Sequence, residues 1–137
     1  MNYKFYTTYS FDKDTKRLSK RYKSLKKDII QLIEDLKTNP QLGTDLGSGL
    51  RKVRMRISDK HKGKSGGARI ITFTLIVSID ETRLHLVCIY DKSERENMTL
   101  DEINNTYCNN DYYNEAIREE PIDFLGRSFS SSSWPFQ

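Results

Sequence analysis

The chain has 137 residues, of which 36% are hydrophobic, and it carries 23 Lys and Arg against 19 Asp and Glu, for a formal net charge of +4. This length and apolar content suit one modest core and exclude two, so we expect a single domain with a tail. Residues 1–107 hold 21 basic and 14 acidic side chains, whereas residues 108–137 hold 2 basic and 5 acidic ones. The expected domain, residues 1–107, is therefore more basic than the whole chain, which favours a polyanionic partner.

Apolar runs are short throughout the chain. No segment approaches the roughly 20 apolar residues that a membrane helix needs, and the first residues lack an apolar run of signal-peptide length. We therefore expect a soluble, cytoplasmic protein that does not enter a membrane. Cys88 and Cys108 have no CxxC spacing and no histidine at ligand spacing, so we expect reduced thiols rather than a zinc site or a disulfide.

The first expected elements are an edge strand and a helical segment. Residues 3–9 alternate weakly between apolar and polar, which predicts a strand at the edge of a sheet. Apolar residues then recur at intervals of three and four over residues 18–36, which predicts a helical face turned to a core. A break near Tyr22, with Ser24 available as a cap, would divide this segment into a two-helix hairpin, so the pattern is consistent with one helix or two.

Proline and glycine interrupt the chain before the apolar period changes to two. Asn39-Pro40 ends the helical segment, because proline disfavours helical geometry in the residue before it. The glycine-rich residues 43–49 are expected to form a loop. From Leu50 the alternation predicts a strand with one apolar face and one basic face. The basic face carries Lys52, Arg54 and Arg56.

Two further strands and a helix complete the expected domain. The apolar run 68–79 is long enough for a central strand buried on both faces, and a hairpin turn at 80–82 leads into a strand over 83–90. Residues 99–107 are predicted to form a short helix that Thr99 caps, with Glu102 in the capping-box position. The predicted fold is α+β: a small antiparallel sheet, made of an edge strand and a three-stranded meander, with one or two N-terminal helices packed on it and a short C-terminal helix.

Residues 108–137 differ from the expected domain. They are acidic, contain a run of serines and several aromatic residues, and have no sustained period. The lack of a period predicts a disordered tail, while the aromatic content leaves docking onto the domain open.

Basic residues concentrate between positions 51 and 69. Eight occur there against the single acid Asp59: Arg51, Lys52, Arg54, Arg56, Lys60, Lys62, Lys64 and Arg69. Same-face residues on a strand lie roughly 6 to 7 Å apart, so the basic face offers a row of cations that a nucleic-acid backbone can follow, although a merely basic surface strand fits equally well. The loop over 58–67 carries lysines that can close over a ligand. We predict RNA binding by Arg51, Arg56, Lys60, Lys62 and Lys64.

The basic strand, the central strand and the strand over 83–90 would form a site if they are neighbours. Cleavage of RNA by its ribose 2′-hydroxyl needs a proton acceptor, cations that stabilise the phosphorane and a donor for the leaving oxygen. Arg69 opens the central strand and is suited to holding a phosphate bidentately. Judged alone, Tyr90 fits a tyrosine at the rim of the core, and Lys92 fits an ordinary turn residue, as well as they fit a functional role. We predict catalytic roles for Lys52, Arg54, Arg69, Tyr90 and Lys92.

The histidines do not form an ordinary ribonuclease pair. His85 alternates with leucines and is expected to be a satisfied strand residue, so His61 in the basic loop is the better outside candidate for an acid or base. No cluster of Asp and Glu suggests a metal-dependent nuclease, and we expect no metal and no cofactor.

Several separated segments occur in an order that resembles a known family. They are Leu50-Arg51-Lys52-Val53-Arg54-Met55, then residues 63–71 and 89–94, and finally Asn97-Met98-Thr99. Over about residues 5–107 the chain resembles the RelE/ParE toxin superfamily, specifically its RelE/HigB-like mRNA interferase branch of type II toxin–antitoxin systems. Some members carry a catalytic tyrosine near the final helix, where this chain has Asn97-Met98-Thr99.

The resemblance implies a toxin that enters the ribosomal A site and cleaves mRNA there without a metal. Its partners would be the ribosome, mRNA and a cognate antitoxin, expected to be of the helix-turn-helix type. Lys52, Arg54, Arg69 and Lys92 fall where the family places cationic catalytic residues, and Tyr90 falls at the tyrosine of a YxK variant. The alternatives are a ParE-like toxin that inhibits DNA gyrase and a non-catalytic module that binds RNA or ribosomes. The set of cations favours the nuclease.

Overall fold

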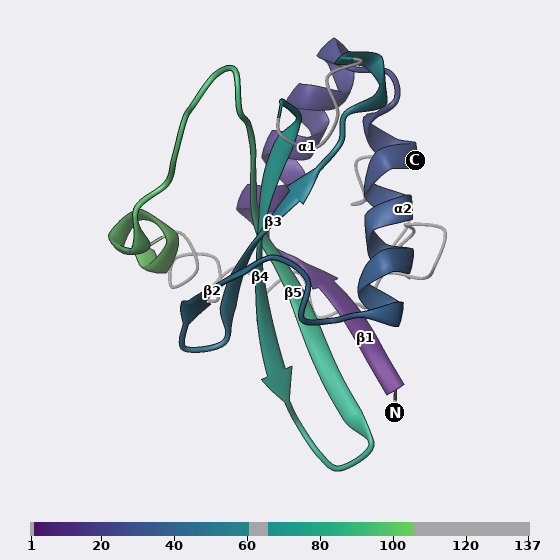
Figure 1. Ribbon diagram of the computed structural model, residues 1–137, viewed down its shortest axis with the longest axis vertical. Helices are drawn as coiled ribbons and strands as arrows, with labels where there is room; N and C mark the ends of the chain where they lie inside the picture. The colour runs from purple at the N-terminus through teal and green to yellow at the C-terminus, as the bar shows by residue number, and fades with distance from the viewer. Residues whose placement is uncertain (1, 61–65, 106–137) are drawn as a thin grey trace.

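The computed structural model describes residues 2–60 and 66–105, and within them the fold is α+β, as predicted (Figure 1). The elements in chain order are β1 (Asn2–Thr7), α1 (Tyr9–Arg21), α2 (Leu25–Thr38), β2 (Thr44–Gly47), β3 (Leu50–Met55), the 3-10 turn η1 (Ser58–Lys60), β4 (Ala68–Ile76) and β5 (Glu81–Asp91). A short helix over residues 100–105 follows. None of the helices in this part of the chain has the length and apolarity needed to cross a bilayer.

The sheet has the strand order β1-β5-β4-β3-β2 and is mixed rather than wholly antiparallel. The predicted meander is present as β3, β4 and β5, and β1 is an edge strand as predicted, but β1 runs parallel to β5. Parallel pairing requires a crossover connection, and α1 and α2 begin the long connection that separates β1 from its partner. The expected loop over 43–49 was wrong in part, because β2 lies within it and pairs with the start of β3.

The N-terminal helical segment is a pair of helices. Tyr22 takes an extended conformation, with φ of −120° and ψ of 108°, so the break near this residue is confirmed. α1 begins at Tyr9 rather than near residue 18, and the hydroxyl of Thr8 caps it by accepting from Phe11 N at 3.1 Å. Ser24 precedes α2 but forms no cap bond; its hydroxyl donates to the Asp28 carboxylate at 2.9 Å.

The sheet has an apolar core on each face. α1 and α2 cover one face, where Val53, Ile70 and Ile89 lie in the core between helices and sheet. The segment that ends in the helix 100–105 covers the other face and packs Ile103 against Ile71. Figure 1 shows this short helix and α2 on opposite sides of the sheet.

Two predictions about the second face are confirmed. Thr99 and Glu102 form the capping box, since Glu102 N donates to the Thr99 hydroxyl and Thr99 N donates to the Glu102 carboxylate, each at 3.2 Å. Cys88 is a free, buried thiol on this face, and burial raises its pKa to about 12. The end of the predicted helix, Cys108 and the predicted tail over 108–137 lie outside the described residues.

The central strand is shorter than predicted. β4 ends at Ile76, and only its first five residues are buried. Ile76 is 74% exposed and Ile79 is 90% exposed, so the prediction of burial on both faces was wrong beyond residue 72. The hairpin between β4 and β5 projects past the other strands (Figure 1), because β3 pairs with β4 only as far as Phe73. An apolar run does not reveal where the neighbouring strand stops.

Gly67, at the entry to β4, lies against the end of β3. A Cβ atom on this residue would meet Met55 O at 2.1 Å and Ile57 N at 2.9 Å. We therefore expect Gly67→Ala to lower the free energy of unfolding by about 1–3 kcal/mol through overpacking against backbone, as measured by urea denaturation. Gly47→Ala is the control, because a Cβ there meets nothing within 4 Å and only the positive φ of 89° adds a cost of about 1 kcal/mol. An equal loss in both variants would refute the close approach.

Candidate functional site

Three of the predicted catalytic residues form a row across the sheet. Arg54 of β3 is the register partner of Arg69 of β4, and Arg69 is the partner of Tyr90 of β5. Directly opposed residues of antiparallel strands point to the same face, so the three side chains are neighbours. Lys52 precedes Arg54 by two residues and Lys92 follows Tyr90 by two, which directs both lysines to that face as well.

A groove of about 600 Å³ lies beside this row. One wall is basic. It is lined by residues of β3, of the start of β4 and of the chain just after β3 and β5: Lys52, Arg54, Arg56, Arg69 and Lys92. Asp28, Gln31 and Asp35 of α2 also line the groove, although α2 packs on the face of the sheet opposite to the one that Arg54, Arg69 and Tyr90 share. The structure thus brings four of the five predicted catalytic residues into one groove with Arg56, and the exception is Tyr90.

Arg69 is a buried cation beside another cation. Its side chain is only 5% exposed, and one guanidinium nitrogen donates to Ala68 O at 3.3 Å. Burial lowers the pKa of this guanidinium, and the charge of Arg54 lowers it further. An arginine nevertheless keeps its charge at neutral pH. The arrangement is unfavourable for an isolated protein and favourable for one that receives an anion between Arg54 and Arg69.

Tyr90 is buried beside the groove rather than exposed in it. The residue is 6% exposed, and its hydroxyl has no hydrogen-bond partner among the residues that the structure describes. Burial raises the pKa of the phenol, against the opposing effect of the Arg69 charge. The phenol is therefore protonated near neutral pH and is poorly placed to accept a proton.

The two lysines of the groove contact the segment that follows β5. Lys52 Nζ donates to Asn97 Oδ1 at 3.2 Å, and Lys92 Nζ donates to Glu96 O at 2.8 Å. Arg95 holds this segment by donating to Asn97 O at 2.9 Å and by pairing with Glu102. Both ammonium groups are thereby kept at the rim of the groove by weak, exposed contacts that a phosphate can replace.

Two residues predicted to bind RNA make contacts within the protein, and their predicted RNA binding stays a prediction. Arg51 donates to Leu42 O at 3.2 Å and to Gly43 O at 3.1 Å, which fastens the segment leading into β2. Lys60 is not a free loop residue, because its ammonium lies 2.8 Å from Asp91 Oδ1 and only 9% of its side chain is exposed. Arg56 is exposed at the groove. His61, Lys62 and Lys64 lie outside the described residues.

His85 is a packed strand residue, in agreement with its predicted role. Its ring stacks on Tyr6 with centroids 5.3 Å apart, and Phe73 lies 6.0 Å away. Burial, and secondarily the charge of Arg83, lower its pKa to about 4, so the ring is neutral at physiological pH. Within residues 2–60 and 66–105, no three His, Cys, Asp or Glu side chains gather in the manner of a metal site.

The α2 residues of the groove and Asn97 did not emerge as parts of the site from the sequence. Asp28, Gln31 and Asp35 follow the polar positions of an amphipathic helix, which is the pattern of any solvated helix face. Only the packing of α2 beside β3 brings these side chains to the same groove as the cations. Asn97 stood within a segment of the family resemblance, but its contact with Lys52 depends on the path of the chain after β5.

Comparison with known proteins bears on what this groove does. Residues 4–125 match the family described as the RelE toxin of the RelE / RelB toxin-antitoxin system. A stretch of 41 residues is 90% identical to YddJ, a protein of Escherichia coli (strain K12); it makes up 30% of this chain and 37% of the length of that relative. The family match covers most of the chain, from within β1 to beyond the helix 100–105. The chain therefore belongs to the RelE family of toxins, whose members pair with an antitoxin.

Proposed function

We propose that this toxin is a metal-independent endoribonuclease that cleaves mRNA in the ribosomal A site. The observation that carries the proposal is the gathering of Lys52, Arg54, Arg69 and Lys92 along one wall of a groove. A cognate antitoxin, of the helix-turn-helix type suggested by the resemblance, would neutralise it. The match to the toxin family supports the proposal at the level of the family.

The cations supply what cleavage by a ribose 2′-hydroxyl requires. In this reaction the 2′-oxygen bonds to phosphorus, the bond from phosphorus to the 5′-oxygen breaks, one proton leaves the 2′-hydroxyl and another joins the leaving oxygen. We assign Arg54 and Arg69 to the non-bridging oxygens of the phosphate, where negative charge accumulates in the transition state. We assign the two proton transfers to Lys52 and Lys92, which line the same groove as Arg54 and Arg69.

Tyr90 has a supporting role in this scheme. Its phenol is buried beside Arg69 and has a raised pKa, so it is unsuited to accept the proton of the 2′-hydroxyl. Its ring instead limits where the Arg69 guanidinium can lie, because the two are cross-strand partners. This revises the catalytic role that we predicted for Tyr90 to one of placing Arg69.

The arrangement favours a nuclease over a toxin that only binds DNA gyrase. Burying Arg69 beside Arg54 lowers the stability of the folded protein, because the guanidinium loses solvation and is repelled by a like charge. A binding surface can present its cations on exposed positions and avoid this cost. A site that stabilises a phosphorane needs a water-poor place for a fixed cation, because electrostatic interactions are stronger there.

Induced expression in a bacterial host tests the proposal. We expect growth to stop and mRNA to acquire new 5′ ends within translated regions, and we expect purified protein to cut mRNA on programmed ribosomes but not free mRNA at the same rate. Growth arrest with intact mRNA and inhibited DNA supercoiling would replace the nuclease by a gyrase inhibitor. Binding to ribosomes without cleavage would leave a non-catalytic module.

A further inference from the structure

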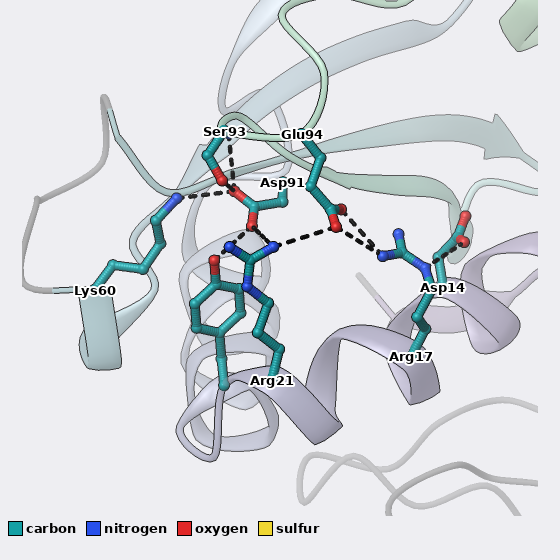
Figure 2. Close-up of polar contacts among 8 residues, drawn as sticks. Asp14, Arg17, Arg21, Lys60, Asp91, Ser93 and Glu94 are labelled. Carbon is teal, nitrogen blue, oxygen red and sulfur yellow. Dashed lines mark hydrogen bonds and ion pairs between the residues drawn. The ribbon is translucent and has the colours of Figure 1, made fainter.

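Asp91 is a buried carboxylate that lies in sequence between two functional candidates, Tyr90 of β5 and Lys92 of the turn that follows. It is the last residue of β5, and none of its surface is exposed to solvent. Four hydrogen bonds reach its two oxygens: Oδ1 accepts from Lys60 Nζ at 2.8 Å and from the backbone nitrogen and hydroxyl of Ser93 at 3.0 and 2.9 Å, and Oδ2 accepts from the Tyr22 hydroxyl at 2.6 Å. Figure 2 shows these side chains converging on the carboxylate.

The carboxylate is ionised although it is buried. Burial alone would raise the pKa of Asp91, but the hydrogen bonds from Lys60, Tyr22 and Ser93 outweigh it and hold the pKa well below its usual range. Arg21 adds a more distant charge, with its guanidinium 3.8 Å from Oδ2. We call Asp91 together with Lys60, Tyr22 and Ser93 the Asp91 cluster. Both carboxylate oxygens of its buried anion accept hydrogen bonds from the other members.

Through these contacts the Asp91 cluster joins three separate parts of the chain. Tyr22 belongs to the junction of α1 and α2, Lys60 is the last residue of η1, and Ser93 lies in the turn that carries Lys92 away from β5. The same turn is closed by Glu94 N and Arg95 N, which donate to Asp91 O at 3.0 and 3.1 Å. Beside the turn, an ion pair of Glu94 with Arg17 at 3.0 Å fastens it to α1 (Figure 2).

The two ends of the connection between η1 and β4, Lys60 and Gly67, are both bonded to residues at the end of β5. Its first end is the Lys60 ammonium on Asp91, and its second end is Gly67 O, which accepts from Lys92 N at 3.0 Å. η1 is itself fixed to α2, because the Asp28 carboxylate accepts from the backbone nitrogen and hydroxyl of Ser58 at 2.9 and 2.6 Å. Residues 60, 67 and 92 therefore keep fixed relative positions next to Arg69.

We propose that Asp91 and Lys60 are positioning residues, which hold the Lys92 turn and the entry to β4 so that Lys92 and Arg69 meet the same phosphate. This inference rests on the proposed endoribonuclease function. Neither residue touches the substrate: the Asp91 carboxylate is wholly enclosed, and the ammonium of Lys60 is turned to it. Positioning of this kind matters because a displacement of about 1 Å in a reacting group can lower the rate on the order of 10²-fold. The residues that support the reacting groups must therefore be rigid.

The decisive variant is Lys60→Met, which removes the ammonium and keeps most of the side-chain volume. Asp91 then retains Tyr22 and Ser93 as donors, so the fold has the means to survive. On ribosomes programmed with mRNA, we expect the single-turnover cleavage rate at saturation to fall about tenfold or more, while the half-saturating ribosome concentration changes by less than about threefold. Lys60→Arg, which can still reach Asp91 with a positive charge, is expected to recover most of the rate.

Ile29→Val is the matched control for lost stability. Ile29 is buried in α2 and belongs to the core between helices and sheet, it makes none of the four hydrogen bonds to Asp91, and its truncation to valine is expected to be mildly destabilising. We expect its saturating rate, corrected for the folded fraction, to equal that of the wild type. A Lys60→Met rate equal to that of this control would overturn the positioning role.

The outcomes separate this inference from the proposed function. A wild-type protein that does not cut mRNA refutes the function itself, whereas an active wild type with a fully active Lys60→Met refutes only the positioning role. If Lys60→Met does not fold, Ser93→Ala decides, because it removes only the hydroxyl contact with Asp91. A loss of the saturating rate in Ser93→Ala, smaller than the loss expected for Lys60→Met, supports the positioning role. An unchanged rate in Ser93→Ala overturns it.

Discussion

Arg69→Met is expected to reduce mRNA cleavage by about 10²- to 10³-fold, the range found when a donor that stabilises transition-state charge is removed. The loss should appear in the cleavage rate at saturating ribosome concentration, because Arg69 as a residue is only 5% exposed and is assigned to the phosphate in the transition state rather than to first contact with the ribosome. The free energy of unfolding of the same variant is expected to be equal to or higher than that of the wild type. Methionine fills the same space without a buried charge opposite Arg54.

Opposite effects on activity and stability are the signature of a functional residue, and two measurements reveal them together. Cleavage is followed by single-turnover kinetics on programmed ribosomes, and stability by urea denaturation of the same preparation. Lys4→Met is the control, since Lys4 is an exposed lysine of β1 that pairs with Glu81, and exposed pairs contribute only about 0–1 kcal/mol. A destabilised Arg69→Met with full activity would reassign Arg69 to the fold.

Asp91→Ala is expected to lower the free energy of unfolding at pH 7 by about 3–5 kcal/mol, the range for breaking a buried ion pair by removing one partner. The Lys60 ammonium, with 9% of its side chain exposed, would remain in the interior without its carboxylate. The Tyr22 hydroxyl and Ser93 would lose their acceptor as well. Urea denaturation at pH 7 measures this loss, and a change below about 1 kcal/mol would show that the Asp91 cluster contributes little to the fold.

The same carboxylate gives the wild type a predictable response to acid. Folding lowers the pKa of Asp91 below its unfolded value of about 3.9, so the folded state binds this proton more weakly than the unfolded state does. The resulting stability is fully present above about pH 4 and is lost as the pH falls towards the lowered folded-state pKa. We expect Asp91→Asn to show a flatter fall in stability below pH 4 than the wild type. Parallel curves would exclude Asp91 as the source of the acid response.

Local patterns in the sequence were sufficient for most of the secondary structure. The alternation from Leu50 predicts β3 with the correct faces, and the spacing of Thr99 and Glu102 predicts a capping box that the structure contains. Both depend on residues within a few positions of one another. The start of α1 was missed, because its buried residues, Phe11, Thr15 and Leu18, are too few to stand out from its charged ones.

The site could be predicted from the sequence only by assuming which strands are neighbours in the sheet. Lys52, Arg54, Arg69 and Lys92 could be expected to converge if β3, β4 and β5 were neighbours, and the register satisfies that condition. Each strand shows its own basic or apolar face, but which residues are directly opposed depends on the length of the turns between them. The α2 residues of the groove could not be expected at all, since they look like an ordinary exposed face of that helix.

Sequence alone determined the α+β class and which cations stand on the strands, because charge and periodicity are properties of the chain itself. Only the tertiary structure decided what surrounds each of them. Lys60 and Arg69 are both cations of the basic stretch 51–69, yet one pairs with a buried carboxylate and the other lies opposite a second cation. The reason is that the neighbours of each cation come from distant segments of the chain, which meet only when the sheet and helices pack. Arg54 is 15 residues from Arg69, and Asp91 and Tyr22 are 31 and 38 residues from Lys60.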